Sequence, residues 1–371
     1  MNVGPMSGAA VSGAAPSGRV LVVDTAPPDE AWAELAAFEA MGLLPTVNLR
    51  RVTDPALRTR IAARWPVVDF DGFDADQLAV HLEDGGRGHR ALKCRAGIPL
   101  TRTVLSRATA PGLRRSLTVA GRAASGSETF DHAAAREFGV TLLTTPGANA
   151  AAVAELTLAL ALDALRGVSR RSAALHGGDW AGAVAGLPVG GLAGARFGLV
   201  GSGAVARRVA GLAAAFGAEV LVHGSPRFTP ERADGWPGRR VGSLAELLTE
   251  CEVVSVHVPA TAETSGLLGE TELRLMRPGS VLVNTARASV VDEAALDRVL
   301  RDPSAGLAAA GVDVFEREGV AAHESALAGN PFCTLSPHAA GMTRSAMRDA
   351  SRRLLAAFAE FLNPTELRLP N

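Results

Sequence analysis

Three segments in the second half of the chain carry polar side chains directly after an apolar, strand-like run. They are Val283–Arg287, Gly311–Glu318 and Ser336–Gly341. An Arg offers a fork of N–H donors that suits a carboxylate, and a His exchanges a proton near neutral pH. A carboxylate beside such a His orients its ring and stabilises the charged form. These residue types predict acid–base chemistry on a small organic acid, with no metal ion.

A glycine-rich turn lies earlier in the chain. The strand-like run Phe197–Val200 leads into Gly201-Ser-Gly203-Ala204-Val205-Ala206, which opens a helical pattern. In this spacing Gly201 permits a tight turn, Gly203 lets the backbone approach a pyrophosphate, and Ala206 lets the helix lie close to the strand. The N–H groups of the helix N-terminus suit an anion. The pattern predicts a dinucleotide-binding unit.

The next strand-like run, Glu219–Val222, ends in His223-Gly224-Ser225-Pro226-Arg227. An acidic residue normally binds the adenosine ribose hydroxyls here, and Gly224 stands in its place. Ser225 and Arg227 could instead hold a 2′-phosphate, since an Arg–phosphate pair is a strong contact. The alternative is an NAD site that lacks one hydrogen bond. We therefore expect NAD(H) or NADP(H) as cofactor and favour NADP(H).

Strand-like and helix-like segments alternate along the whole chain. In the first part the runs are Arg19–Asp24, Val47–Val52, Pro66–Phe70, Leu92–Arg95, Leu117–Ala120 and Val140–Thr144. In the second part they are Phe197–Val200, Glu219–Val222, Glu252–Val258, Ser280–Asn284, Leu307–Val312 and Cys333–Leu335. This alternation predicts an α/β fold with parallel sheets covered by helices on both faces. All three polar segments should then meet at the carboxyl edge of one sheet.

Turn and capping signals divide the chain. A long helical pattern runs from Ala150 to about Leu175 after the turn Thr145-Pro-Gly147. We expect a disordered tail at residues 1–18, a first doubly wound domain at 19–146 completed by 340–371, and a second at 147–339. A cleft between the domains would close over substrate by a hinge motion. Ser243-Leu-Ala-Glu246 and Asp292 should cap helices, and a helix over Arg344–Phe361 should return to the first domain.

Composition excludes several classes of protein. The 37 basic and 38 acidic side chains nearly cancel, so no nucleic acid or anionic membrane partner is expected. No apolar stretch is long enough to span a membrane. Cys94, Cys251 and Cys333 are scattered without metal-ligand or disulfide spacing, which favours a reducing, cytoplasmic location.

These motifs, with His257-Val258-Pro259 and Met276–Gly279 between them, resemble those of the D-isomer-specific 2-hydroxyacid dehydrogenases over roughly residues 89 to 355. The resemblance implies a flavodoxin-like substrate domain, a Rossmann domain, and hydride transfer between NAD(P)H and a small 2-keto or 2-hydroxy acid. It implies that Arg287 binds the substrate carboxylate and that His338 is the acid–base on the C2 oxygen. Glu318 would pair with the imidazole, with Glu316 as the alternative.

The resemblance also implies the other site residues. Arg95, Ala96 and Gly97 match a loop that binds the substrate carboxylate, and Ser125 matches a contact in the glycine-rich loop beside the nicotinamide. Asp313 would hold the nicotinamide carboxamide. The remaining cofactor contacts would be Val258, Thr285, Ala286 and Gly341, with Arg287 and His338 also close to the cofactor. At Ser127–Asp131 the chain departs from the family, which usually has an apolar residue followed by Asp-Asn there.

Two alternatives stay open. One is a formate- or phosphite-type dehydrogenase, which uses the same scaffold on a smaller oxyanion. The other is a non-catalytic, dinucleotide-sensing binding protein of this fold. The presence of Arg287, Glu318 and His338 together favours the 2-hydroxy acid enzyme. Family members usually pair through the dinucleotide domain, so the resemblance implies a homodimer, to which the apolar Ala150–Leu162 segment could contribute.

Overall fold

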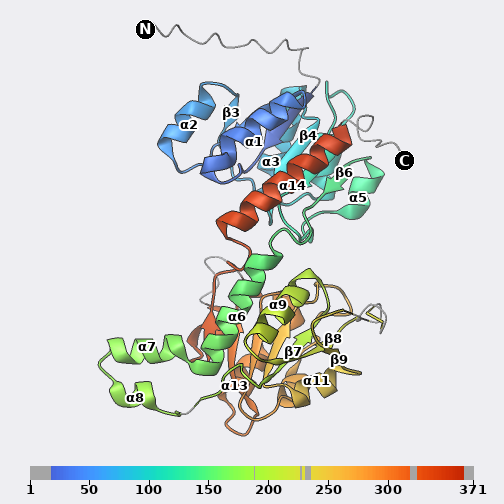
Figure 1. Ribbon diagram of the computed structural model, residues 1–371. Helices are drawn as coiled ribbons and strands as arrows, with labels where there is room; N and C mark the ends of the chain where they lie inside the picture. Colours follow the sequence, from blue (N-terminus) through green and yellow to red (C-terminus); the bar gives the residue numbers. More distant parts are fainter. Residues whose placement is uncertain (1–17, 188, 226–227, 230–234, 318–323, 363–371) are drawn as a thin grey trace, which may run out of the picture. The chain divides into compact units, whose positions relative to one another are not determined.

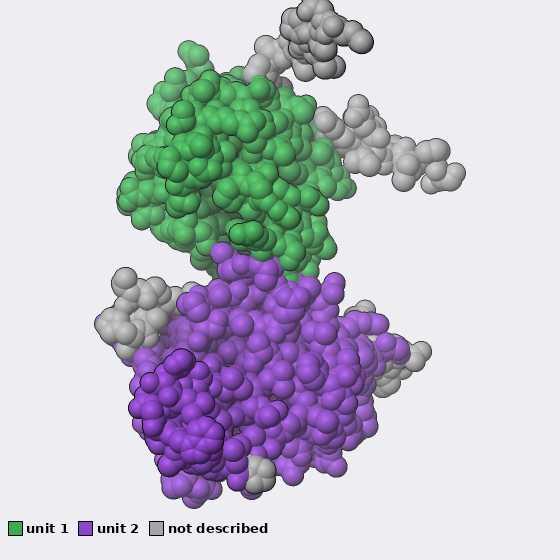
Figure 2. Space-filling view, turned by 60° about the vertical axis from the view of Figure 1, so that its left-hand side comes forward, with its two compact units in different colours: residues 1–149, 344–371 green, residues 150–343 purple. Residues whose placement is uncertain are grey.

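The computed structural model describes residues 18–187, 189–225, 228–229, 235–317 and 324–362. The chain forms two compact units, coloured green and purple in Figure 2. The first unit comprises residues 1–149 and 344–371, and the second comprises residues 150–343. Each has its own parallel sheet with a hydrophobic core on both faces. The predicted fold class of two doubly wound α/β domains is confirmed.

The first unit has a six-stranded parallel sheet in the order β3-β2-β1-β4-β5-β6. The strands are β1 (Gly18–Val22), β2 (Leu43–Asn48), β3 (Val67–Val68), β4 (Ala91–Cys94), β5 (Val119–Arg122) and β6 (Thr141–Leu143). The helices are α1 (Pro28–Ala40), α2 (Pro55–Ala62), α3 (Ala75–Glu83), α4 (Arg102–Ala108), α5 (His132–Glu137) and α14 (Arg344–Leu362). The strand order reverses direction between β1 and β4, where loops diverge and ligands bind in such sheets.

Helices cover both faces of this sheet. Leu21 of β1 packs into the core under α3, α4 and α5, whereas its neighbour Val22 packs into the core under α1, α2 and α14. Helix α14 lies against α1, as Figure 1 shows, and the rings of Phe38 and Phe358 meet edge to face at 5.3 Å. A side chain at Gly121 would clash with Phe358, so β5 needs glycine beneath this helix.

The second unit has a seven-stranded parallel sheet in the order β13-β12-β11-β10-β7-β8-β9. The strands are β7 (Arg196–Val200), β8 (Glu219–His223), β9 (Arg239–Arg240), β10 (Val253–Val256), β11 (Ser280–Asn284), β12 (Leu307–Val312) and β13 (Cys333–Leu335). The helices are α6 (Ala150–Arg166), α7 (Val168–His176), α8 (Trp180–Val184), α9 (Ala204–Ala215), α11 (Leu244–Glu250), α12 (Glu270–Arg274) and α13 (Glu293–Arg301). Helices α6 and α9 pack on one face, and α11, α12 and α13 on the other.

Two expectations about the elements were wrong, and one strand was not foreseen. The helical pattern over 150–175 is two helices, because Gly167 adopts a left-handed conformation (φ +62°) that ends α6 and starts α7. The second strand lies at Leu43–Asn48 rather than at 47–52, since Arg50 and Arg51 already follow the buried run. The two-residue strand β9 was not predicted at all, because two consecutive arginines carry no apolar strand signal.

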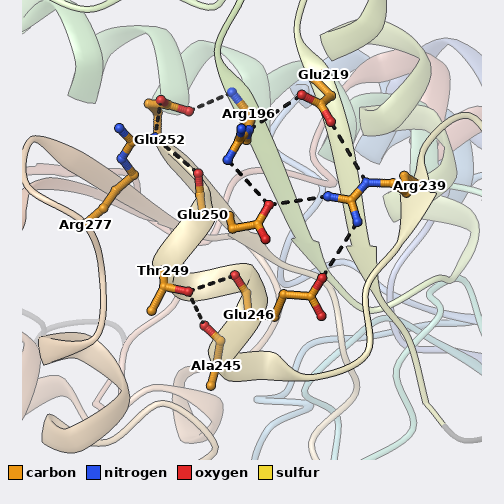
Figure 3. A network of polar contacts seen from close by, with 9 residues as sticks. All are labelled: Arg196, Glu219, Arg239, Ala245, Glu246, Thr249, Glu250, Glu252 and Arg277. Carbon is orange, nitrogen blue, oxygen red and sulfur yellow. Dashed lines mark hydrogen bonds and ion pairs between the residues drawn. The ribbon is translucent and has the colours of Figure 1, made fainter.

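An ion-pair network crosses the amino edge of the second sheet (Figure 3). Arg239 lies within 4.0 Å of Glu219, Glu246 and Glu250, and Arg196 contacts Glu219 and Glu250. These residues stand at strand starts and on α11, at the end of the sheet opposite the ligand-binding edge. The network is therefore a surface feature of the sheet rather than part of a site. Among the helices of the described residues, none has the length and apolar composition that a membrane-spanning helix needs.

Candidate functional site

The turn between β7 and α9 has the geometry of a phosphate cradle. Gly201 adopts φ +115°, and a Cβ there would lie 2.5 Å from the carbonyl oxygen of His257. Gly203 is the N-cap residue of α9 and has open space where a side chain would stand. Ala206 is fully buried against the sheet. The backbone N–H groups of the first turn of α9 are thus exposed to an incoming anion, and the residues fit a dinucleotide pyrophosphate.

His257 follows β10 beside this cradle and serves the fold. Its Nε2 lies 2.9 Å from the hydroxyl of Ser255, and its backbone N–H donates to Val200. Burial lowers the pKa of His257 to about 3, so the ring is neutral across the physiological range. It cannot act as a charged acid there. A Cβ on Gly201 would also lie 3.2 Å from a methyl carbon of Val258, the residue after His257.

The turn after β8 shows why the expected acidic residue is missing. A Cβ on Gly224 would lie 2.6 Å from the side chain of Phe228, which packs edge to face on Trp236. A carboxylate at this position would displace that buried pair. Ser225 is exposed and accepts the backbone N–H of Phe228 through its carbonyl. Arg227 lies outside the described residues.

The strand β9 brings a further cation to this turn. Arg240 pairs in register with Val222, the residue before His223. Burial and the nearby Arg240 both lower the pKa of His223. Arg239, its neighbour, lies in the ion-pair network, whereas no carboxylate of the described residues pairs with Arg240. The sequence alone does not single out Arg240, because only the strand register places it beside the turn after β8.

Arg287 follows β11 in a loop that its neighbours hold rigidly. The side chain of Asn284 accepts the N–H of Ala286 and donates to the carbonyl of Arg287 at 3.0 Å. The hydroxyl of Thr285 lies 2.8 Å from that of Thr157 on α6. Nη1 of Arg287 donates to the carbonyl of Ala286 at 2.7 Å. The predicted anchor therefore has a preorganised backbone, and Asn284 is a positioning residue that the sequence did not single out.

His338 is anchored by Asp313. The backbone N–H of His338 donates to the carbonyl of Asp313 at 2.8 Å, and the two carboxylate oxygens accept the N–H groups of Ala339 and Ala340. Asp313 is fully buried. His338 adopts φ +52°, a conformation that a non-glycine residue holds only when its surroundings enforce it. Thus Asp313, predicted as a cofactor contact, also carries the loop that presents His338. Gly341 follows in the same loop.

We expect Asp313→Ala to destabilise the protein by about 3 kcal/mol, because two backbone N–H groups lose a buried, charged acceptor. Activity should fall more than about tenfold as the His338 loop loosens. Chemical denaturation and steady-state kinetics measure both effects. The control is Asp292→Ala, which removes the cap of α13 and should cost about 1 kcal/mol with activity retained. Equal activity in both variants would contradict the role of Asp313.

Two carboxylates, Glu318 and Glu316, are predicted as the partner of His338. Glu318 lies outside the described residues, and Glu316 is exposed. The buried Glu293 of α13 accepts the N–H of Glu316 and, through its other oxygen, the hydroxyl of Ser325. Through these two hydrogen bonds Glu293 holds a residue on each described side of the loop that contains Glu318. Sequence reasoning missed this second positioning residue.

The first unit places its predicted site residues at the reversal of its sheet. Ala96 and Gly97 are exposed, and Gly97 adopts φ +84°. Arg95 is half-buried, and burial lowers its pKa against the opposing effect of Asp24. The hydroxyl of Ser125 accepts the N–H of Gly147 and lies 3.2 Å from the side-chain oxygen of Asn149.

A hollow of about 490 Å³ opens at the same edge of this sheet, lined by loops after β1, β2 and β3. Its charged residues include Asp24, Arg50 and Arg51, and Arg51 lies 3.5 Å from Asp24. Burial raises the pKa of Asp24, and one of its oxygens has no partner among the described groups. Charged side chains thus line one part of the hollow, beside the apolar Val23, Phe70, Phe73 and Ile98. Among the described residues, no His, Cys, Asp and Glu side chains gather as a metal site would require.

Comparison with known proteins agrees with this arrangement. The family profile described as "D-isomer specific 2-hydroxyacid dehydrogenase, NAD binding domain" matches residues 158–340. The glyoxylate reductase of Aeropyrum pernix is 35% identical over 259 residues, which is 68% of this chain and 76% of that protein. The (S)-sulfolactate dehydrogenase of Chromohalobacter salexigens is 36% identical over 278 residues, 74% and 85% of the two chains.

A third relative is longer than this chain. The D-3-phosphoglycerate dehydrogenase of Methanocaldococcus jannaschii is 30% identical over 308 residues, covering 81% of this chain and 54% of that protein. Among solved structures, the TT0316 protein from Thermus thermophilus superposes with a TM-score of 0.72 at 31% identity, covering 92% of this chain and 96% of that one. A glyoxylate reductase from Paecilomyes thermophila gives 0.74 at 26% identity, with 94% and 96% covered.

The chain belongs to the D-isomer specific 2-hydroxyacid dehydrogenase family. This confirms the resemblance inferred from the motifs. The family consists of oxidoreductases that use a nicotinamide dinucleotide and act on hydroxy acids.

Proposed function

We propose that this protein transfers a hydride between NAD(P)H and C2 of a small 2-keto or 2-hydroxy acid. One observation carries the proposal: the loops after the adjacent strands β11, β12 and β13 present Arg287 and His338, with Asp313 hydrogen-bonded to the His338 loop. The phosphate cradle after β7 belongs to the same sheet edge. A charged fork and a proton donor beside a dinucleotide site are what reduction of a 2-keto acid requires.

Each residue has a definite task in this reaction. The bound cofactor supplies the hydride. Arg287 binds the carboxylate and polarises the C2 oxygen, on which negative charge develops. His338 donates a proton to that oxygen in reduction and accepts it in oxidation, with Glu318, or else Glu316, orienting its ring. The loop Arg95–Gly97 binds the carboxylate through backbone N–H groups, and Ser125 lies beside the nicotinamide.

The remainder of the substrate would enter the hollow of the first unit, beside its charged residues. Its lining by Asp24, Arg50 and Arg51 favours a polar or acidic substituent over a hydrocarbon chain. The named relatives act on glyoxylate, sulfolactate and phosphoglycerate, all of them small and polar. We therefore propose a 2-keto acid whose far end is polar, and not a long aliphatic one.

A substrate panel tests this function. Glyoxylate, hydroxypyruvate, 3-sulfopyruvate, 3-phosphohydroxypyruvate and 2-ketoisocaproate are each offered with NADH and with NADPH. We expect at least one of the polar acids to be reduced with far higher kcat/KM than 2-ketoisocaproate. Formate and phosphite, offered with NAD⁺ and NADP⁺, test the runner-up activity. A protein that binds dinucleotide but turns over none of these compounds would instead be the non-catalytic sensor.

The cofactor is proposed to be NADP(H), with the 2′-phosphate held at the turn after β8. Ser225 lies on this turn, Arg227 follows it in sequence, and Arg240 supplies a cation from the adjacent strand. Gly224 places no carboxylate there to repel a phosphate. These four features thus favour a 2′-phosphate over a free hydroxyl.

Arg240→Ala should lower kcat/KM for NADPH by about tenfold and leave that for NADH nearly unchanged, because only NADPH loses a charge-assisted contact. Steady-state kinetics with both cofactors measure the ratio. Arg239→Ala is the matched control: it removes the neighbouring arginine, whose partners are Glu219, Glu246 and Glu250. If wild type prefers NADH and Arg240→Ala alters neither efficiency, the site is an NAD site that lacks one hydrogen bond.

We also propose a homodimer, formed through the second unit. The segment with α7 and α8 exposes large apolar side chains to a substantial degree, namely Val168, Leu175, Trp180, Val184 and Leu187. Trp180 alone is 71% exposed. Sedimentation should give twice the chain mass of 38.1 kDa, and Trp180→Asp should weaken the association at least about tenfold. A wild-type monomer at micromolar concentration would refute the proposal.

A further inference from the structure

One arginine of the first unit is buried without a carboxylate partner. Arg122 ends β5 and is 1% exposed. Its Nη1 donates to the carbonyl of Gly126 at 3.1 Å, and its Nη2 donates to the carbonyl of Ile98 at 2.7 Å and to the hydroxyl of Thr129 at 2.6 Å. The guanidinium stacks on Phe130 at 3.7 Å. Within the described residues, no Asp or Glu pairs with Arg122, and its Nε has no acceptor.

The neighbouring buried cation differs in this respect. Lys93 of β4 lies 3.0 Å from Glu34, and both side chains are almost fully buried. The thiol of Cys94, which interacts with Arg122, cannot replace a carboxylate, since burial raises its pKa to about 11. At this sheet edge the carboxylate of Glu34 balances the buried charge of Lys93. No carboxylate of the described residues balances the buried charge of Arg122. A buried cation without an anion raises the free energy of the ligand-free state.

Arg122 lies between the two loops that the proposed function uses. Ile98 closes the loop Arg95–Gly97, and Gly126 belongs to the loop that contains Ser125. Among the described residues, the amides of Ala96 and Gly97 have no acceptor. Ile98, whose carbonyl accepts a hydrogen bond from Arg122, directly follows Gly97 and so connects the buried charge to these amide donors.

We propose that the carboxylate of the substrate is the missing counter-ion of Arg122. Bound to the Arg95–Gly97 loop, the carboxylate would lie above the buried guanidinium and balance its charge without touching it. Arg122 is then a positioning residue that also attracts the anion through a poorly screened field. The inference rests on the proposed function, because it takes that loop as the carboxylate site.

The departure of this chain from the family pattern has the same explanation. The departure falls within Ser127–Asp131, and two residues of this segment, Thr129 and Phe130, hold the guanidinium of Arg122. Thr129 also donates to the carbonyl of Ile98 at 2.8 Å. In this proposal the altered loop serves to hold the buried guanidinium of Arg122. It is not a substrate site that has lost its function.

Thr129→Asp tests the proposal by supplying a counter-ion from the protein itself. Oxamate, an anionic analogue of a 2-keto acid, is titrated into NADH- or NADPH-loaded protein. We expect Thr129→Asp to raise Tm and to weaken oxamate binding about tenfold or more, because the new carboxylate balances Arg122. Thr129→Asn, the neutral isostere, should change oxamate affinity less than about threefold. Cofactor affinity should stay the same in both variants.

Arg122→Met and Arg122→Lys provide the second arm. Removing the charge should raise KM for the keto acid about tenfold with a smaller change in kcat, and Lys should restore part of the loss. Unchanged oxamate affinity in a folded Thr129→Asp protein would overturn the inference, as would equal losses in Thr129→Asp and Thr129→Asn. Wild-type protein that binds cofactor but no oxamate would count against the proposed function itself, and the inference would fall with it.

Discussion

Replacing His338 by Asn is expected to lower turnover by about 10²–10⁴-fold, the usual contribution of a general acid–base. Asn tolerates the left-handed backbone that His338 adopts at φ +52°, so the loop should keep its shape. It cannot exchange a proton near neutral pH. Dinucleotide affinity should change little, because the phosphate cradle of Gly201 and Gly203 is untouched.

The measurement is kcat and KM across a range of pH, with fluorescence titration of the cofactor. The matched control is His176→Gln, which alters an exposed histidine at the end of α7 and should change no kinetic parameter. If His338→Asn retained near-normal turnover at every pH, His338 would not be the proton donor. A parallel loss of cofactor affinity would show instead that the loop had collapsed.

Arg287→Ala is expected to lower kcat/KM for the keto acid by about 10³-fold or more, because a bidentate charge-assisted contact is lost in both the ground and the transition state. KM should rise, and kcat should fall as well if Arg287 polarises the C2 oxygen. Arg287→Lys keeps the charge but not the planar fork, and should recover only part of the activity.

The control for this experiment is Arg298→Ala. Arg298 lies on α13 in the same unit, is exposed, and pairs with Glu270. Its loss should leave kcat/KM within about twofold, as expected for a surface ion pair. An Arg287→Lys protein with full activity would show that charge alone matters, and an unaffected Arg287→Ala protein would remove Arg287 from the site.

Much of the fold was predictable because parallel strands are buried and apolar. The strands β11, β12 and β13 lie at the predicted residues. The cap at Ser243 accepts the N–H of Glu246 as its motif predicts. The cradle was also predictable, since Gly201 needs a positive φ that few other residues allow. Local sequence is sufficient where the physical constraint is local.

What the sequence could not show depends on contacts between distant segments. From the sequence, Gly224 indicates only that a hydrogen bond to the adenosine ribose is missing. The packing of Phe228 explains why no carboxylate stands at this position. Arg240 gains its meaning from strand register, and Arg122 from partners in two other loops. Both arginines look like ordinary surface residues when their neighbours in space are unknown.

Isotope labelling of the cofactor shows directly where the hydride goes. Cofactor carrying deuterium at C4 of the reduced nicotinamide is incubated with the keto acid that the substrate panel selects, and the product is examined by NMR and chiral chromatography. Hydride transfer to the keto carbon predicts a 2-hydroxy acid of D configuration with deuterium at C2. In the His338→Asn protein the same labelled product should form, only more slowly. A product without deuterium at C2, or deuterium found elsewhere, would contradict hydride transfer to the keto carbon.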